Sequence, residues 1–127
     1  MKTLLYFGIV SGMFSLSCLP VQAHHSTAGY DLIHGTIVSG VVTRFEWENP
    51  HVQLFLEVAT DGEPEHWNIE MDSPVTLARL GWNKDSLKPG DRISVTGSRA
   101  KDLSFRIRAG YVQWPDGHKL LSLPPES

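Results

Sequence analysis

Three histidines are the residues of this 127-residue chain best suited to metal chemistry. If the mature protein begins at His24, that residue offers a free amine together with its imidazole, and His25 adds a second imidazole. Nitrogen ligands of this kind favour Cu(II) over harder cations, and His51 would supply a third nitrogen. The pattern gives a copper-binding carrier or sensor as one hypothesis. The alternative is a polar arm whose first residues merely suit a processing site.

His51 is also expected to lie near two carboxylates. A two-residue loop at 49–50 pairs Glu48 with His51, and it pairs Arg44 with Phe55 further along the same two strands. In the following hairpin we expect Leu54 opposite Met71, which brings Asp72 diagonally close to His51. Glu48, His51 and Asp72 therefore form a candidate metal set. The simpler interpretation is a turn histidine that hydrogen-bonds to Glu48.

The outer face of the first three strands is a second candidate site, where a ligand would dock. Phe55 flanked by Arg44 is suited to stacking a ring or a sugar, because a guanidinium is attracted to an aromatic face. The alternatives are a protein-docking surface without a small ligand, and a solvated face with one isolated apolar residue. The candidate docking residues are Arg44, Gln53, Phe55, Glu57, Asn68 and Glu70.

Motifs of nucleophilic catalysis are missing from the sequence. The single cysteine, Cys18, precedes the expected start of the mature chain, and there is neither a Gly-x-Ser-x-Gly elbow nor a phosphate-binding glycine loop. The residues therefore favour a non-catalytic binding module over an enzyme, with copper as the one cofactor they suggest.

The first 23 residues have the pattern of a cleavable signal peptide. Lys2 precedes a short apolar run, and Val21-Gln22-Ala23 places small residues at the positions before a cleavage point. The run is too short and too interrupted to cross a bilayer. We therefore expect a periplasmic protein that begins at His24 and has no membrane span in its mature form.

The composition of the mature chain limits its partners. Ten Lys and Arg residues (eleven less Lys2) stand against fourteen Asp and Glu residues, a formal charge of −4. This acidity argues against nucleic acid, whose phosphates attract basic surfaces, and leaves a small ligand or a periplasmic protein as the expected partner. Four Trp and five Phe residues indicate an ordered domain.

Alternating polarity predicts where the strands lie and which residues they bury. In a long first strand after Gly35 we expect Ile37, Val41, Phe45 and Trp47 inward, with Gly40 at a bulge or bend. The inward residues of the later strands are expected to be Val52, Leu54, Leu56, Val58, Trp67, Ile69, Met71, Ile93 and Val95.

One short helix and two further strands complete the pattern. Ser73 is an N-cap followed by Pro74 at the first helical position, and Gly81 ends the helix. A turn at 88–91 leads to a fourth strand over 92–97, and a fifth strand is expected over about 103–114.

The order of three strands, a short helix and two strands predicts the fold class. It is typical of a mainly β, five-stranded OB-like partly closed barrel with the helix between strands three and four; a β-sandwich would need more strands. We expect a signal peptide at 1–23, an N-terminal arm at 24–34, the barrel domain at 35–122 and a tail at 123–127.

Several short motifs resemble one family of small exported bacterial proteins, a domain of unknown function. They are His24-His25-Ser26, Tyr30-Asp31, Gly40, Trp47-Glu48-Asn49-Pro50-His51, Trp67, the Ser73-Pro74 helix through Leu80-Gly81-Trp82, and Leu87-Lys88-Pro89-Gly90-Asp91. The resemblance covers nearly the whole mature chain and implies a periplasmic, small β domain with no established reaction. After Lys101-Asp102 the family pattern would continue with glycine, where this chain has Leu103.

Overall fold

The structure, a computed structural model, describes residues 27–124. This part of the chain forms one 3-10 turn, six strands and one short α-helix. The elements are η1 (Thr27–Gly29), β1 (Tyr30–Glu46), β2 (Gln53–Val58), β3 (Glu65–Glu70), α1 (Pro74–Arg79), β4 (Arg92–Ala100), β5 (Arg106–Gln113) and β6 (Lys119–Leu121).

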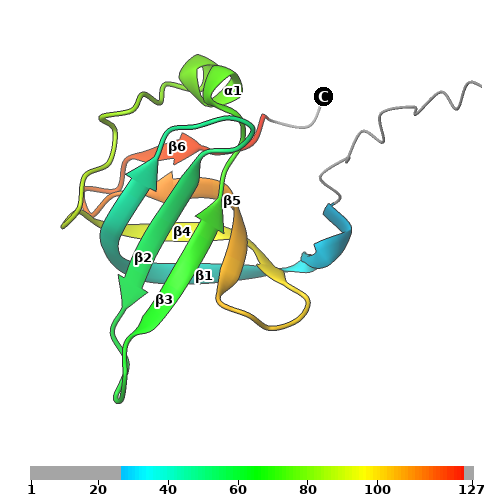
Figure 1. The fold of residues 1–127 in the computed structure, drawn as a ribbon, viewed down its shortest axis with the longest axis vertical. Coiled ribbons are helices and arrows are strands. Elements are labelled where there is room, and N and C mark those ends of the chain that lie inside the picture. Colours follow the sequence, from blue (N-terminus) through cyan, green and yellow to red (C-terminus); the bar gives the residue numbers. More distant parts are fainter. Residues whose placement is uncertain (1–26, 125–127) are drawn as a thin grey trace, which may run out of the picture.

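The first five strands form a ring-like, partly closed sheet (Figure 1). β1 pairs antiparallel with both β2 and β4, while β3 extends the sheet beyond β2 and β5 extends it beyond β4. The ring closes where β3 and β5 run parallel, with Ile69 opposite Ile107. This topology confirms the predicted OB-like fold, and β6 is an additional strand that pairs with β5.

The interior of the ring is filled by apolar side chains. All the predicted inward residues of β2, β3 and β4 lie in this core or pack against it. The alternation of apolar and polar residues therefore identified the buried face correctly in β2, β3 and β4. Those residues are Val52, Leu54, Leu56, Val58, Trp67, Ile69, Met71, Ile93 and Val95.

Helix α1 covers one end of the barrel, and the tip of the β2–β3 hairpin marks the other (Figure 1). The Ser73 hydroxyl caps the helix by accepting from the backbone N–H of Thr76, as the sequence predicted. Leu77 is fully buried, so the helix closes the end of the core. Within residues 27–124, no helix is long and apolar enough to span a membrane.

The first half of β1 shows the opposite face from the one expected. Val38 and Val42 are buried, whereas Ile37 is 70% exposed. The reason is a bulge between Val42 and Arg44, which reverses the alternation so that Phe45 still packs against the core. A bulge or bend was expected at Gly40, and the bulge lies about three residues further along, whereas Gly40 itself pairs regularly with Ile93.

Two boundaries of the predicted strands also differ. β1 begins at Tyr30, which pairs with Ala100, so the described part of the expected arm is a 3-10 turn followed by strand. β5 begins at Arg106, because the chain first turns through Leu103 with φ of 62°. Glycine tolerates this left-handed conformation best, which explains why the family pattern would have glycine there.

The β2–β3 hairpin is paired two residues away from the expected register. Leu54 lies opposite Ile69, and Gln53 lies opposite Glu70. Both registers keep apolar residues on the same face, so alternation alone does not separate them. The consequence for the site is that Glu70 takes the position that Asp72 was expected to hold.

Candidate functional site

The predicted metal ligands do not come together in the described part of the chain. His24 and His25 lie outside residues 27–124. Glu48 is exposed, and Asp72 turns to the helix, where its Oδ1 accepts from the backbone N–H of Ser73 at 2.6 Å. No group of three His, Cys, Asp or Glu residues within the described ranges is arranged to hold a metal ion.

His51 instead points towards the end of β3. Its Nδ1 lies 3.0 Å from the carbonyl oxygen of Met71 and 3.6 Å from Glu70 Oε1. Since a carbonyl oxygen only accepts hydrogen bonds, Nδ1 carries a proton. The expected partners Glu48 and Asp72 are thus replaced by Glu70.

Glu70 is the centre of a polar cluster on the outer face of the barrel. Its Oε2 accepts a hydrogen bond from the Tyr30 hydroxyl at 2.8 Å, and its Oε1 lies 3.5 Å from Arg108 Nη1. Burial, followed by the hydrogen bond and charge of Glu70, raises the pKa of Tyr30 to about 12. The sequence drew attention to Glu70 as a docking residue and to Tyr30 as part of a short motif, but it did not indicate that the two are in contact.

Two amide side chains of the predicted docking face have unused hydrogen-bonding capacity. Gln53 Oε1 and Asn68 Oδ1 are both buried and have no hydrogen-bond partner among the described residues. An unsatisfied buried acceptor costs free energy, about 1–3 kcal/mol. Both oxygens are covered by neighbouring protein atoms, so a ligand's O–H or N–H group reaches them only when the amide side chains turn outward.

A hollow of about 480 Å³ lies beside Phe55 on this face. The predicted pair is present there, with the Arg44 guanidinium 4.0 Å from the centre of the Phe55 ring. The expected pairing of these two residues across β1 and β2 is confirmed. We refer to this site as the Phe55 hollow; its lining residues are Thr43, Arg44, Phe55, Leu56, His66, Trp67 and Asn68.

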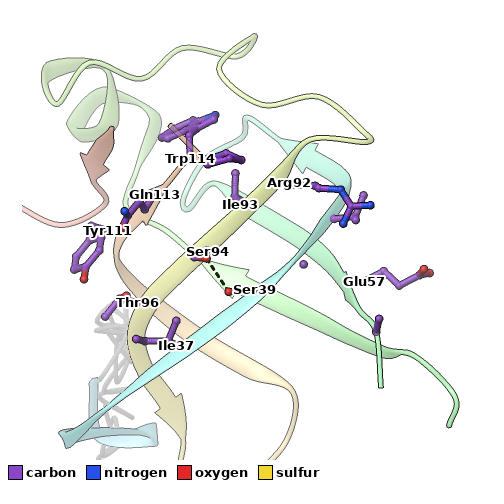
Figure 2. A pocket seen from close by; sticks show the side chains of 14 residues that line it. Ile37, Ser39, Glu57, Arg92, Ile93, Ser94, Thr96, Tyr111, Gln113 and Trp114 are labelled. Carbon is purple, nitrogen blue, oxygen red and sulfur yellow. Dashed lines mark hydrogen bonds between the residues drawn. The ribbon is translucent and has the colours of Figure 1, made fainter. Parts of the chain in front are cut away.

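A larger hollow, of about 800 Å³, crosses the outer face of β1, β4 and β5. Figure 2 shows the Ser39–Ser94 hydrogen bond in its middle, with Tyr111 and Gln113 on one side and Arg92 with Glu57 on the other. We call this site the β1–β4–β5 groove. Glu57 was assigned to the docking face by its strand, but it lines this second site.

The sequence missed the groove because its floor is made of small polar residues. Ser39 and Ser94 have no distinctive chemistry in a linear sequence, and they become a pair only through β1–β4 pairing. The alternation of β1 around Ser39 could have placed this serine on the outer face. The bulge after Val42 reverses the alternation, so the pattern read along the whole strand gave the wrong face.

The candidate residues are thus divided among three places. Arg44, Phe55 and Asn68 border the Phe55 hollow. Gln53 lies directly opposite Glu70 across β2 and β3. Glu57 lines the groove. Stacking surfaces, unpaired acceptors and hydroxyl groups are the chemistry of molecular recognition.

The chain belongs to the Family of unknown function (DUF6152), which matches residues 13–107. This membership confirms the resemblance inferred from the short motifs. The match spans β1 to β4 and ends at the beginning of β5. No curated protein matches the chain.

Proposed function

We propose that this chain is a non-catalytic binding module that is exported to the periplasm and holds a small ring-containing ligand in the Phe55 hollow. The observation that carries the proposal is a concave site that combines an aromatic side chain, a guanidinium and an amide with an unpaired oxygen. Ligand sites are commonly apolar concavities with a few polar groups that fix orientation.

The Arg44 side chain can adapt to a ligand at low cost. It is 59% exposed and its Nε lies 3.0 Å from Glu46 Oε1. An exposed ion pair of this kind contributes only about 0–1 kcal/mol. A flat ring is therefore able to stack on the guanidinium, or to displace it from Phe55, without a large loss.

Asn68 would orient the bound ring. It lies directly opposite Phe55 across β2 and β3 and lines the hollow, and a turn of its amide would bring the buried, unpaired Oδ1 to the ligand. A ring with an N–H or O–H group at its edge satisfies this atom, whereas a purely hydrocarbon ring leaves it unsatisfied. The ligand class that fits is a flat ring with a hydrogen-bond donor.

Export to the periplasm is supported by the signal pattern of the first 23 residues. Mass spectrometry of the untagged protein recovered from the periplasmic fraction tests it. We expect a chain that begins at His24. A mature chain that retains the apolar segment would contradict export by cleavage.

Binding is tested by NMR titration of the mature, ¹⁵N-labelled protein with indole, adenosine and phenyl β-glucoside, each of which has a ring and a donor. We expect shifts centred on Phe55, His66 and Asn68. Benzene is the matched probe without a donor, and it should bind more weakly. Shifts centred elsewhere, or none with any probe, would overturn the proposal.

Two substitutions at one position separate stacking from general apolarity. Phe55→Leu keeps an apolar side chain but removes the ring, and we expect binding to weaken about tenfold. Phe55→Tyr keeps the ring and should bind nearly as well as the wild type. Val75→Ala, on the exposed side of α1, is the control for an unrelated surface change.

A further inference from the structure

We propose that the β1–β4–β5 groove is a second binding site, and that it takes a neutral, hydroxyl-rich ligand of the oligosaccharide class. The groove and the Phe55 hollow share no lining residue. It lies across β1, β4 and β5, away from the strand 2–3 face that OB-type barrels commonly use. The proposal therefore goes beyond the function assigned to the hollow.

The middle of the groove is a row of uncharged polar side chains. Ser39 on β1 lies opposite Ser94 on β4, and Ser94 lies opposite Gln113 on β5. The two serine hydroxyl oxygens are 2.7 Å apart (Figure 2). Each hydroxyl both donates and accepts hydrogen bonds, and the amide does the same, so this row suits the vicinal hydroxyls of a sugar.

The row beside it provides apolar and aromatic contact. Ile37 lies opposite Thr96, and Thr96 lies opposite Tyr111. Ile37 is 70% exposed although it is aliphatic, so a ligand that covers it gains burial of apolar surface. A sugar ring has both an apolar face and a polar rim, and therefore matches an apolar row next to a polar one.

One wall of the groove is held rigid by ring contacts. Trp114 stacks with His118 at 4.2 Å between ring centres, and its ring centre is 5.6 Å from that of Trp82. The adjoining β4 strand keeps Ser94 and Thr96 on a regular ladder with β1. A preorganised site loses less conformational entropy on binding.

The charges at the groove explain why a neutral ligand fits best. Glu57 and Arg92 are the cross-strand neighbours of Val41 on its two sides, and both line the groove. These two lining groups balance each other, and the Lys119 ammonium, 4.9 Å from the centre of the Tyr111 ring, is a single further charge beside the groove. The hydroxylated floor likewise disfavours a purely apolar chain, since its polar groups would lose water without gaining partners.

The groove is also of suitable size. Its volume of about 800 Å³ lies within the range of roughly 300–1,000 Å³ found for small-molecule sites. Its lining residues come mainly from β1, β4 and β5, so a short oligosaccharide is able to lie across three strands.

NMR titration of the mature protein with cellotriose, maltotriose and chitotriose tests the proposal, and trigalacturonic acid is the acidic comparison. We expect at least one neutral trisaccharide to shift the amides of Ser39, Ser94 and Gln113. An adequate upper concentration is about 10 mM, since open sugar sites are weak. Absence of shifts with all three neutral sugars, or stronger binding of the acidic one, would overturn the proposal.

Matched serine substitutions locate the binding. Ser94→Val removes one hydroxyl from the floor and should weaken binding about tenfold. Ser98→Val makes the same change on the same strand outside the groove and should leave affinity unchanged. Gln113→Leu is a second test at the other end of the polar row, in case Ser94→Val disturbs folding. Equal binding by Ser94→Val, Gln113→Leu and the wild type would contradict the site.

The two sites are distinguished by their variants. Phe55→Leu should weaken indole binding about tenfold while leaving trisaccharide binding intact. Ser94→Val should have the opposite effect. Loss of both responses in Phe55→Leu would show that the trisaccharide binds in the Phe55 hollow, and would overturn the proposal of a second site.

Discussion

Tyr30 shows how one side chain joins parts of the barrel that are far apart in sequence. It begins β1, yet its hydroxyl donates to Glu70 at the end of β3, forty residues away. Burial favours the neutral phenol over the charged phenolate, and the carboxylate strengthens that preference. The first residues of β1 are thereby fixed against the outer face.

We expect Tyr30 to make stability sensitive to alkaline pH. Its pKa is raised from 10.0 to about 12, so the folded protein retains a proton that the unfolded chain loses. The stabilisation is complete below about pH 10 and is lost as pH rises towards 12. Denaturant unfolding over this interval should show a steeper loss for the wild type than for Tyr30→Phe.

Subtracting the tyrosinate absorbance of Tyr30→Phe from that of the wild type gives the titration of Tyr30 alone. It should follow a titration centred near pH 12. A difference curve centred at the ordinary value of 10.0 would contradict the buried hydrogen bond to Glu70. Glu70→Gln should lower the midpoint, because it removes the charge and weakens the acceptor.

The strands differ in how far their sequence determines them. β2 and β3 alternate cleanly, so both buried faces were predicted correctly. In β1 the backbone of Val42 bonds to Gly90 and Asp91 at 2.8 Å each, and the adjacent bulge reverses the face. That contact depends on a turn nearly fifty residues later, which local alternation does not reveal.

Register was predictable only where a short connection fixes it. The pairing of Arg44 with Phe55 followed from the loop before His51 and is confirmed. In the β2–β3 hairpin, a shift of two residues preserves every buried face, so Asp72 was chosen where Glu70 stands. The Arg44–Phe55 pair could therefore be predicted, and the carboxylate next to His51 could not.

The close pairing of β4 with β5 requires glycine at position 97. A Cβ atom there would collide with the carbonyl oxygen of Arg108, while a Cβ at Gly35 would meet nothing. We expect Gly97→Ala to lower the free energy of unfolding by about 2–3 kcal/mol. Gly35→Ala, also in a strand, should change it by less than about 0.5 kcal/mol.

Urea denaturation followed by circular dichroism measures both variants. Equal stability of the two alanine variants would contradict the close approach of β4 and β5. Gly97→Ser serves as a second comparison, because it adds the same Cβ with a polar atom and should be destabilised at least as much.

On the scale of the whole molecule, the partly closed ring carries the two proposed binding surfaces on different strands. Phe55 and Asn68 lie on β2 and β3, whereas Ser39 and Ser94 lie on β1 and β4. No residue lines both hollows, and changes at sites without shared partners usually add independently. If both proposals hold, two ligands of different chemistry bind independently on a single core.

The charge of the molecule decides between the two ligand classes that OB-type barrels commonly bind, oligosaccharides and oligonucleotides. The chain has a formal charge of −3. Two arginines of β5 are already paired, Arg106 with Asp102 and Arg108 with Glu70. The net negative charge opposes the approach of a phosphate backbone, and these two carboxylates reduce the positive potential along β5.

We consequently expect no binding of a fluorescent oligothymidylate in anisotropy measurements, with a dissociation constant weaker than about 100 μM at physiological salt. The double variant Asp102→Asn/Glu70→Gln frees Arg106 and Arg108 from their carboxylates. It should bind more tightly than the wild type, with an affinity that falls as salt increases. Micromolar binding by the wild type, or no gain in the double variant, would show that local pairing of these arginines does not determine the preference.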